Sequence, residues 1–466
     1  MRIAIVGSGV AGNAAAWALA RAPGQAREVV LYEKDPRAGG HAHTIDIDYD
    51  GERVAVDLGF IVYNTLNYPN LVALFDQLGV ATKPSSMGFA VSVDGGKREW
   101  KGDDRMLSGL IARRRNLISP RFWLMIAEIL RFNRLAIRDR ARGDIGGMSL
   151  GAWLTRHRFK GRFLSDYLLP MGAAIWSMPT DAMLRFPAES FIGFFDNHRL
   201  LHFDRPVWRT VDGGSRSYVK RLLDDVAGRL ELRLGRAVTQ VERDGGSVFV
   251  SDASGARERF DHVILAGHSD QMLAVLADPS AAEQATLGAI RYRDNRVYLH
   301  RDPALMPKRR AAWAAWNFLA RTAPEAGKAD AAVSYSMNLL QGIPDRLPLF
   351  VSLNPPAPPA PHLTFHSFVT GHPQFDADAI EAQARLGDLQ GGRNTWYCGA
   401  WAGHGFHEDG LKAGLDVAER LGASIPWRVA GGAKTNAEGA KMGSDGPATD
   451  ARDDDATAPA MAEAAE

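Results

Sequence analysis

The sequence predicts an α/β protein in which a Rossmann-type domain is interleaved with a second, α+β domain. Three observations lead to this fold class. Residues 2–33 follow the order strand, glycine-rich turn, helix and strand. Similar strand and helix patterns return after residue 211 and again after residue 388. The two segments in between carry mixed helical and strand patterns with many aromatic residues, which is typical of inserted material.

The first element is a strand that begins almost at the N-terminus. Apolar residues dominate Arg2 to Val6, and after a glycine-rich turn an alanine-rich stretch from Asn13 to Ala22 predicts a helix. A second apolar run, Val29 to Tyr32, predicts the next strand. This order is a βαβ unit, in which a helix connects two parallel strands.

The turn has the spacing Gly7-x-Gly9-x-x-Gly12. Gly7 permits a tight turn, Gly9 lets backbone N–H groups approach a pyrophosphate, and Gly12 lets the helix pack closely on the strand. The positive end of the helix stabilises phosphate charge. Glu33 lies 21 residues beyond the last glycine, where it can accept hydrogen bonds from a ribose diol and would repel a 2′-phosphate. The turn therefore predicts a dinucleotide site.

The remaining elements alternate between the two predicted domains. After residue 211 we expect a helix over 217–227 and strands over 231–234, 237–243, 247–251 and 262–266. Later segments predict strands over 295–300, 363–369 and 395–398 and a helix over 411–421. We assign residues 1–83, 211–286 and 388–426 to the dinucleotide-binding domain, and 84–210 and 287–387 to the substrate domain. The tail, 427–466, is rich in small and polar residues and is expected to be disordered.

Composition excludes several classes of protein. With 466 residues, 46% of them hydrophobic and 23% charged, the chain can bury several cores and is not a disordered protein. The net charge of +1 gives no global field for nucleic acid. Two segments depart from this balance. Residues 105–142 contain ten arginines and two acids, a local charge of +8, and residues 429–466 contain three cations and eight acids, a local charge of −5. A signal-peptide pattern and an 18-residue apolar run are both missing, so we expect a cytoplasmic protein.

Two more stretches extend the glycine fingerprint. Residues 37–44 (RAGGHAHT) with 56–59 (VDLG) follow the acid, and residues 398–405 (CGAWAGHG) close the globular part. With them the chain, up to about Gly422, resembles the FAD-binding superfamily of monoamine oxidases, protoporphyrinogen oxidases and phytoene desaturases. The resemblance implies a glutathione-reductase-like, Rossmann-type FAD-binding domain and FAD as the cofactor.

A bacterial branch of predicted NAD/FAD-binding oxidoreductases in that superfamily resembles the chain further. Its members carry stretches like residues 59–64 (GFIVYN), 174–177 (AIWS), 372–373 (HP) and 405–410 (GFHEDG). Some of them resemble desaturases that act on methylated fatty acyl chains of phospholipids. The resemblance implies the same substrate class for this chain.

The resemblance also implies which residues hold FAD. The Gly39–Gly40 turn and Thr44 would lie along the pyrophosphate and ribityl chain, Val238 would meet the adenine, and residues 399–414 would bring a helix N-terminus to the isoalloxazine ring. A helix N-terminus there stabilises the negative charge of a reduced flavin. The expected cofactor-binding residues are Gly7, Gly9, Val10, Ala11, Gly12, Glu33, Lys34, Gly39, Gly40, His41, Thr44, Gly59, Val238, Gly399, Trp401, Gly405, Gly410 and Leu411.

Candidate acid–base residues lie at the flavin-facing turn and upstream of it: His404, His407, Glu408 and His372. These residues also have plainer explanations, because the two turn histidines can bond to backbone or flavin edges and Glu408 can complement a helix dipole. The sequence leaves open which of them, if any, moves a proton. No second glycine fingerprint follows a strand, so a nicotinamide site is not expected and the substrate itself would reduce FAD.

Other reactive side chains have structural explanations. His41 and His43 are expected to line the ribityl or flavin edge, and no metal site is expected because no carboxylate or cysteine cluster accompanies them. Cys398 is expected to be a buried structural residue. The covalent flavin attachment of monoamine oxidases uses a cysteine well upstream of the terminal glycine motif.

The inserted segments point toward a hydrophobic substrate and a membrane surface. Their aromatic residues suit either a core or an apolar tunnel. In the predicted helix 122–137, Glu128 and three arginines form a polar stripe, and apolar residues fill the rest. Together with the other arginines of the Arg113–Arg142 region it resembles an interfacial anchor on anionic lipid at the inner membrane face. The alternative is a solvated helix over a core; nucleic acid is not expected, because no reading motif accompanies the charge.

The sequence therefore predicts an FAD-dependent oxidoreductase of the desaturase type. It would take a hydride at flavin N5 from a hydrophobic, phospholipid-borne methylated fatty acyl chain and pass electrons to oxygen, a quinone or another acceptor. The rivals are a flavin amine oxidase, a flavin-dependent double-bond isomerase and a flavin-fold binding protein. Amine-oxidising relatives place a Lys near N5, and residues 292–298 offer none. The oligomeric state stays open.

Overall fold

The glycine-rich turn belongs to a parallel sheet at one side of the computed structural model, which describes residues 1–22, 27–102, 114–176, 180–202, 204, 206–321 and 330–428. Within these residues the sheet has five strands, all of whose neighbours are parallel. Across the sheet the order is β10 (Leu230–Arg233), β2 (Glu28–Tyr32), β1 (Arg2–Val6), β14 (His262–Leu265) and β20 (Thr395–Tyr397).

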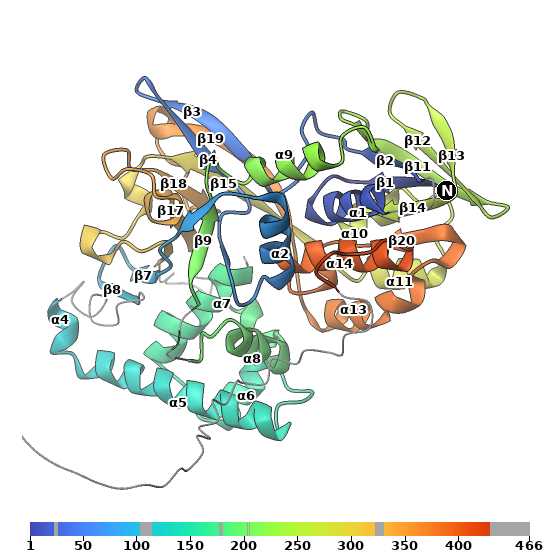
Figure 1. The fold of residues 1–466 in the computed structure, drawn as a ribbon. Helices are drawn as coiled ribbons and strands as arrows, with labels where there is room; N and C mark the ends of the chain where they lie inside the picture. The colour runs from blue at the N-terminus through green and yellow to red at the C-terminus, as the bar shows by residue number, and fades with distance from the viewer. Residues whose placement is uncertain are drawn as a thin grey trace, which may run out of the picture. The chain divides into compact units, whose positions relative to one another are not determined.

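Helices and a small antiparallel sheet cover the two faces of this parallel sheet (Figure 1). Ile3 and Ile5 point to one face and Ala4 and Val6 to the other, as the two-residue period of a strand requires. The first face carries α1 (Val10–Arg21), α2 (Pro69–Leu78), α9 (Arg216–Asp225) and α14 (His407–Arg420). The second carries β11 (Val238–Asp244), β12 (Ser247–Asp252), β13 (Arg257–Phe260), α10 (Ser269–Ala274), α11 (Ala281–Leu287) and α13 (Ala377–Leu389).

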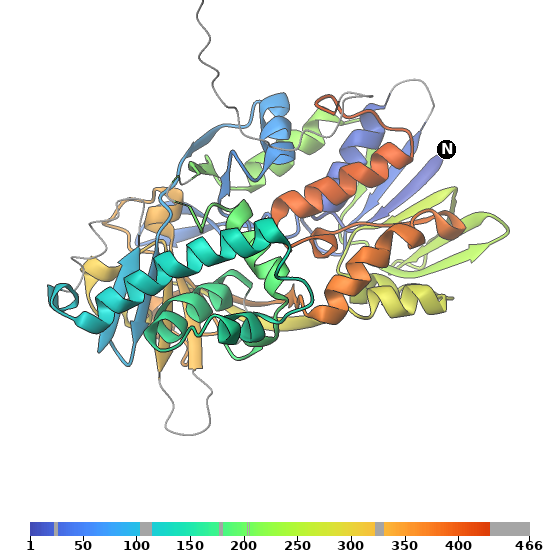
Figure 2. The ribbon, with the colours of Figure 1, turned by 90° about the horizontal axis from the view of Figure 1, so that it is seen from below.

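The second part of the protein is built on a larger sheet and a helical cluster. The order of the seven strands described in this sheet is β19 (Thr364–Pro373), β15 (Tyr292–His300), β18 (Phe350–Leu353), β17 (Asp330–Ser336), β16 (Trp316–Arg321), β7 (Phe89–Val93) and β8 (Arg98–Gly102). Helix α12 (Met337–Gln341) follows β17. The cluster contains α4 (Arg114–Leu117), α5 (Pro120–Arg142), α6 (Leu150–Arg156), α7 (Leu169–Trp176) and α8 (Ala188–Asn197). Figures 1 and 2 show α5 running along the outside of the other helices.

Two small strand groups connect these parts. One is the hairpin of β3 (Thr44–Tyr49) and β4 (Glu52–Asp57). The other places β9 (Trp208–Val211) between β5 (Tyr63–Asn64) and β6 (Thr82–Pro84). The chain therefore passes from one part to the other several times.

The strands of the parallel sheet all come from the segments 1–83, 211–286 and 388–426, and those of the large sheet from 84–210 and 287–387. Residues Met1–Trp427 nevertheless form one compact unit, so the limits of the two domains stay a prediction. The ring of Trp427, the first residue of the predicted tail, stacks on Trp17 at 5.6 Å. Residues 429–466 lie outside the described part, and their disorder stays a prediction.

The predicted elements differ from the observed ones mainly at their ends. Helix α14 begins at His407, four residues before the predicted start, because the Asp409 carboxylate accepts a hydrogen bond from the Phe406 N–H at 2.9 Å and caps the first turn. Strand β13 was missed, since its alternation of exposed arginine with buried residues is short. Helix α5 extends beyond the predicted 122–137 at both ends.

Candidate flavin site

The glycine loop lies between β1 and α1 with the geometry that its spacing predicts. A Cβ on Gly12 would stand 1.8 Å from the Gly7 carbonyl oxygen, so only glycine lets the helix approach the loop. A Cβ on Gly9 would meet nothing within 4 Å, so this residue faces open space. Gly9 is also the N-cap of α1, and no side chain caps the helix. Free backbone N–H groups and an open approach are what a pyrophosphate requires.

Glu33 bonds to this loop at the end of β2. Its Oε2 accepts hydrogen bonds from the Ser8 N–H at 2.9 Å and the Ser8 hydroxyl at 2.6 Å, and its Oε1 accepts one from the Asp35 N–H at 3.0 Å. The Arg236 N–H donates to the Glu33 carbonyl. Val238 therefore lies two residues along the chain from a direct contact with Glu33. The carboxylate thus fixes the loop, and its bond to a ribose stays a prediction. The next residue, Lys34, is exposed.

The second glycine pair packs directly on the first loop. The Gly39 N–H donates to the Ser8 carbonyl at 2.9 Å. Gly40 has a φ of +55°, and a Cβ on it would lie 2.9 Å from the Gly9 Cα. Gly59 is equally constrained, since its Cβ would stand 2.2 Å from the His41 carbonyl oxygen. These close approaches bring residues 39–41 and 59 to the glycine loop.

Arg37 carries a half-buried positive charge beside this loop. Its Nη2 donates to the Gly40 carbonyl at 3.0 Å, and its buried Nη1 has no hydrogen-bond partner among the described residues. Burial lowers the pKa of this guanidinium. A half-buried guanidinium whose Nη1 has no hydrogen-bond partner, next to an uncapped helix N-terminus, suits an anion, so the residues present fit the pyrophosphate of FAD. The sequence pointed to Arg37 only as part of the resemblance.

Thr44 belongs to a buried hydrogen-bond network, and its contact with the ribityl chain stays a prediction. Its hydroxyl donates to Asp57 Oδ1 at 2.5 Å, and its oxygen accepts the Arg216 N–H at 3.0 Å. Asp57 also accepts hydrogen bonds from the Ser215 N–H at 2.9 Å and the Gln341 side chain at 2.9 Å. The fully buried Asp57 therefore connects β4 with α9 and α12. Sequence analysis missed this network because its partners are far apart in the chain.

The terminal glycine segment brings α14 onto the start of α1. A Cβ on Gly410 would lie 2.7 Å from Val10 Cγ1, and one on Gly414 would lie 2.1 Å from the Ala11 carbonyl oxygen. The side chains of Ala11 and Leu411 belong to the core between the two helices, so any contact with FAD is through their backbone.

The same segment is anchored to β14. Trp401 is buried, and its indole N–H donates to the Gly267 carbonyl at 3.0 Å. A Cβ on Gly399 would lie 2.3 Å from the indole nitrogen of Trp401. Gly405 has a φ of +90°, where its Cβ would stand 2.9 Å from Phe375 Cε2. The segment thus begins beside β14 and turns toward the aromatic residues of the second part of the protein.

Two of the four candidate acid–base residues have structural roles. Glu408 accepts hydrogen bonds from the Asn70 N–H at 2.9 Å, the Asn70 side chain at 2.6 Å and the Leu71 N–H at 2.9 Å, so it caps α2. His407 is buried, stacks on Phe60 at 3.9 Å between ring centroids and hydrogen-bonds Tyr218 through Nε2. Burial lowers the pKa of His407 to about 3. These contacts give both residues a structural role, and a catalytic role for either stays a prediction.

The other two candidates lie in different surroundings. His372 lies 5.8 Å from His41, which lies 6.3 Å from His268, between ring centroids. Burial lowers the pKa of His372 to about 3 and that of His268 to about 4. His404 instead faces Phe194, at 5.9 Å between ring centroids, and its side chain is exposed. Sequence analysis missed His268, although it follows the end of β14, where site residues of parallel sheets are expected.

His41 lies between His372 and His268. Its side chain is exposed, and desolvation by the surrounding protein nevertheless lowers its pKa. A neutral imidazole at this position fits the edge of a site for an uncharged ring.

Cys398 is confirmed as a buried, free cysteine. Burial raises the pKa of its thiol to about 12, so it stays protonated. In the described residues no group of three or more His, Cys, Asp and Glu side chains is arranged to hold a metal ion.

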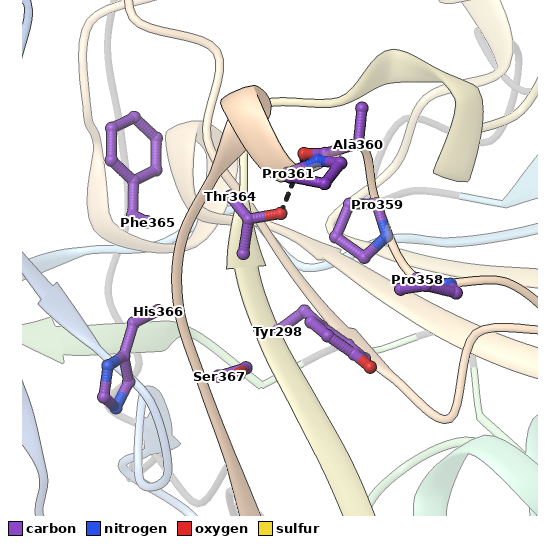
Figure 3. A pocket seen from close by; sticks show the side chains of 9 residues that line it. All are labelled: Tyr298, Pro358, Pro359, Ala360, Pro361, Thr364, Phe365, His366 and Ser367. Carbon is purple, nitrogen blue, oxygen red and sulfur yellow. Dashed lines mark hydrogen bonds between the residues drawn. The ribbon is translucent and has the colours of Figure 1, made fainter.

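A separate hollow of about 630 Å³ lies at the start of β19 (Figure 3). Prolines 358, 359 and 361 form one wall, and Tyr298 and His366 lie on the other side. The Thr364 hydroxyl donates to the Ala360 carbonyl at 3.0 Å. None of the predicted cofactor or catalytic residues lines this hollow.

Comparison with known proteins also indicates a flavin-binding protein. Residues 10–298, more than half of the chain, match the family model of flavin containing amine oxidoreductases. No curated protein matches the chain. A fatty acid isomerase from P. acnes that produces CLA is similar in structure, with a TM-score of 0.63 and 14% identity over 91% of this chain and 99% of that chain.

Two amine oxidases are similar to the same degree. Cyclohexylamine oxidase from Brevibacterium oxydans has a TM-score of 0.61 and 15% identity over 90% of this chain and 99% of that chain. Putrescine oxidase bound to putrescine has a TM-score of 0.61 and 16% identity over 90% of this chain and 99% of that chain. At such identities the likeness shows the shared fold.

The predicted fold class, a Rossmann-type FAD-binding part interleaved with an α+β substrate part, is confirmed by the parallel sheet and by the family match. The family match also confirms FAD as the cofactor. The chain belongs to the flavin containing amine oxidoreductases and is an FAD-dependent oxidoreductase of that superfamily.

Proposed function

We propose that the protein is an FAD-dependent dehydrogenase of the desaturase type, whose substrate is a hydrophobic, phospholipid-borne fatty acyl chain carrying a methyl modification. The observation that carries the proposal is the set of side chains at the flavin-facing turn. They are aromatic, and the carboxylates next to them bond to the protein itself. The methyl modification and the phospholipid rest on the resemblance of the sequence alone.

The aromatic residues come from α8 and from the turn. Phe406 stacks on the buried Phe194 at 5.1 Å between ring centroids, and Phe194 stacks on His198 at 3.8 Å. Phe375 lies against Gly405. Burial lowers the pKa of His198 to about 4, so this imidazole is neutral at pH 7. An uncharged hydrocarbon loses no hydration energy on entering such surroundings.

The neighbouring carboxylates are already used. Glu408 caps α2, Asp409 caps α14, and Asp57 joins three elements. A substrate amine enters as an ammonium ion, whose burial requires an anionic or aromatic partner. The described residues around the turn thus offer no free carboxylate for that ion, and the described strand β15 contains no lysine. The missing lysine favours a hydrocarbon substrate over an amine, whereas the aromatic side chains suit either substrate.

FAD, when bound, supplies the hydride acceptor at N5. His372 and His268 have pKa values of about 3 and about 4, so both are weak bases at pH 7. The main contribution of the chain is therefore to position the substrate and to exclude water. The aromatic residues would hold the acyl carbon against the ring. Of the four candidate acid–base residues, His404 is the one whose side chain is exposed.

The structural neighbours include proteins that act on fatty acids and proteins that act on amines. One of them is a fatty acid isomerase, and others are oxidases of putrescine and cyclohexylamine. The isomerase is the specific reason to keep a second candidate, a double-bond isomerase that acts on the same acyl substrate without net redox.

Anaerobic substrate addition distinguishes these functions. The holoenzyme is mixed either with phospholipids that carry methylated acyl chains or with putrescine and cyclohexylamine, and the visible absorbance of the flavin is followed. We expect bleaching with the phospholipids. Bleaching with the amines alone would reverse the proposal, and a shifted double bond without bleaching would favour the isomerase.

A further inference from the structure

The exposed apolar side chains of the protein concentrate on α4, α5 and the residues between them. Among the described residues eleven large apolar side chains are exposed, and five of them lie within residues 117–130. Ile118 is 82% exposed and Leu124 is 63% exposed. The other three are Leu117, Trp123 and Leu130. Single exposed apolar residues are normal on a protein surface, but a contiguous group marks a site of interaction.

Helix α5 presents this group on the same side as its arginines. Phe122, Met125, Phe132 and Ala136 are buried against the helical cluster. The outward side carries Trp123, Leu124 and Leu130 in its first half. At helical spacing the same side continues with Arg134, Arg138 and Arg142, all exposed. With 23 residues the helix is about 34 Å long.

The sequence predicts a polar stripe of Glu128 and three arginines, with apolar residues over the rest of the helix surface. In the structure the side opposite the arginines packs on the protein, and the remaining apolar residues share the outward side with them. A helix that lies flat can therefore present its apolar and cationic halves to one plane at the same time.

The outward side carries an excess of positive charge. Arg131 pairs with Glu128 at 2.6 Å, Arg138 with Asp139 at 2.7 Å, and Arg140 with Asp196 at 2.5 Å. The exposed side chains of Arg115, Arg121, Arg134 and Arg142 form no ion pair within the described part of the chain. Free cations beside exposed apolar groups complement an anionic headgroup layer above an acyl layer.

We propose that residues Leu117, Ile118, Trp123, Leu124 and Leu130 together with Arg115, Arg121, Arg134 and Arg142, here named the α4–α5 face, dock on an anionic phospholipid bilayer. The aliphatic side chains enter the acyl boundary, Trp123 lies at the headgroup level, and the arginines bind lipid phosphates. The binding is peripheral and reversible. None of the described helices combines the length and hydropathy of a membrane span.

The charge and the shape of the face favour lipid over other partners. A nucleic acid backbone would meet four unpaired arginines but also five exposed apolar side chains, which it cannot bury. A second copy of the chain would bring the same positive charge to the contact. A lipid bilayer satisfies both halves of the face.

The α4–α5 face is also connected to the flavin-facing turn through α8. Arg140 pairs with Asp196 near the C-terminal end of α8, and Phe194 of the same helix stacks on Phe406. Docking would therefore place the membrane one helix away from the turn. The inference stands on the exposed residues and does not depend on the proposed substrate.

Vesicle cosedimentation of the full-length holoenzyme tests the inference. The probes are vesicles of phosphatidylcholine alone and of phosphatidylcholine with phosphatidylglycerol. The apolar variant is Ile118→Ser with Leu124→Ser, and its matched control is Val207→Ser with Val369→Ser, at residues that are 62% and 55% exposed elsewhere. The charge variant is Arg134→Gln with Arg142→Gln, matched by Arg296→Gln with Arg420→Gln. Flavin absorbance and thermal unfolding report whether each variant folds.

We expect binding to the anionic vesicles only. The charge variant should weaken it about tenfold or more, since each arginine near an anionic surface contributes about 1 kcal/mol. The apolar variant should release the protein at high salt, and both controls should bind as the parent does. Absence of binding to anionic vesicles, or equal binding by the folded variants, would overturn the inference. A dimer or a nucleic acid complex that the variants abolish, without vesicle binding, would assign the face to those partners instead.

Discussion

Ser8 donates its backbone N–H and its hydroxyl to the same carboxylate oxygen of Glu33, at 2.9 and 2.6 Å. The acid at the end of β2 therefore holds the glycine loop in shape before any nucleotide arrives. A hydrogen bond to a buried charged group contributes about 1.5–3 kcal/mol. The loop and the acid thus form one preorganised unit.

Replacing Glu33 with Ala should weaken FAD binding by about tenfold to a hundredfold, because the loop loses its support and the ribose loses its predicted acceptor. Titration of the apoprotein with FAD, followed by flavin fluorescence, measures this change. Glu28→Ala on the same strand is the control, since the side chain of Glu28 is 58% exposed and pairs with Arg2. Equal affinities of the two variants would contradict the role of Glu33.

Two glycines of the loop should respond differently to alanine. Gly9→Ala places a methyl group in open space, so the free energy of unfolding of the apoprotein should stay within about 0.5 kcal/mol of the parent value. Its FAD affinity should fall, because the methyl group blocks the approach of the pyrophosphate. Gly12→Ala forces the methyl group to 1.8 Å from the Gly7 carbonyl oxygen and should lower the free energy of unfolding by more than about 3 kcal/mol. Chemical denaturation of both apoproteins and FAD titration separate the two effects. Normal FAD affinity in Gly9→Ala would exclude the predicted pyrophosphate position.

Arg37→Met should weaken FAD binding without lowering the stability of the apoprotein. The substitution removes a half-buried cation whose Nη1 has no hydrogen-bond partner, so the apoprotein should be about as stable as the parent. FAD affinity should fall by about a hundredfold, because the pyrophosphate loses its charged partner. A variant that binds FAD normally would show that the anion lies elsewhere. Denaturation of the apoprotein and FAD titration give the two readouts.

Glu408→Gln tests whether this residue is structural. Its carboxylate caps α2, so the free energy of unfolding should fall by about 1–2 kcal/mol while kcat stays within about twofold of the parent. His404→Ala is the comparison at the same turn, with an exposed side chain and no cap to lose. A large loss of kcat in Glu408→Gln at full FAD occupancy would instead support Glu408 as an acid–base residue.

The buried histidines predict a loss of stability in acid. Burial lowers the pKa of His407 and His372 to about 3 and that of His268 to about 4, from an ordinary value of 6.5. Protonation is easier in the unfolded chain, so the stability present above pH 6.5 should be lost as the pH falls from 6.5 toward about 3. Denaturation of the apoprotein across this range measures the slope. His407→Phe should reduce the slope, and His362→Gln, at an exposed residue, should not.

The part of the site that the sequence predicted is local. Gly7, Gly9 and Gly12 lie in one loop, and their spacing alone defines a turn, a phosphate approach and a helix contact. Glu33 follows at the end of the next strand, and its distance along the chain is set by the length of the βαβ unit.

The contacts that the sequence did not predict join distant segments. Glu408 and Asn70 are 338 residues apart in the chain, and Asp57 and Ser215 are 158 apart. Their pairing follows from the packing of α14 on α2 and of α9 on β4, which no local pattern encodes. The outward side of α5 was missed for the same reason, since the face that a helix buries depends on its neighbours.

A single anaerobic turnover tests the central claim most directly. The holoenzyme is mixed with phospholipid vesicles whose acyl chains carry a methyl modification, flavin reduction is measured by absorbance, and the acyl chains are then analysed by mass spectrometry. The account predicts one additional double bond in an acyl chain for each FAD reduced. Unchanged acyl chains together with oxidised flavin, in a preparation whose flavin is reduced by amines, would contradict it.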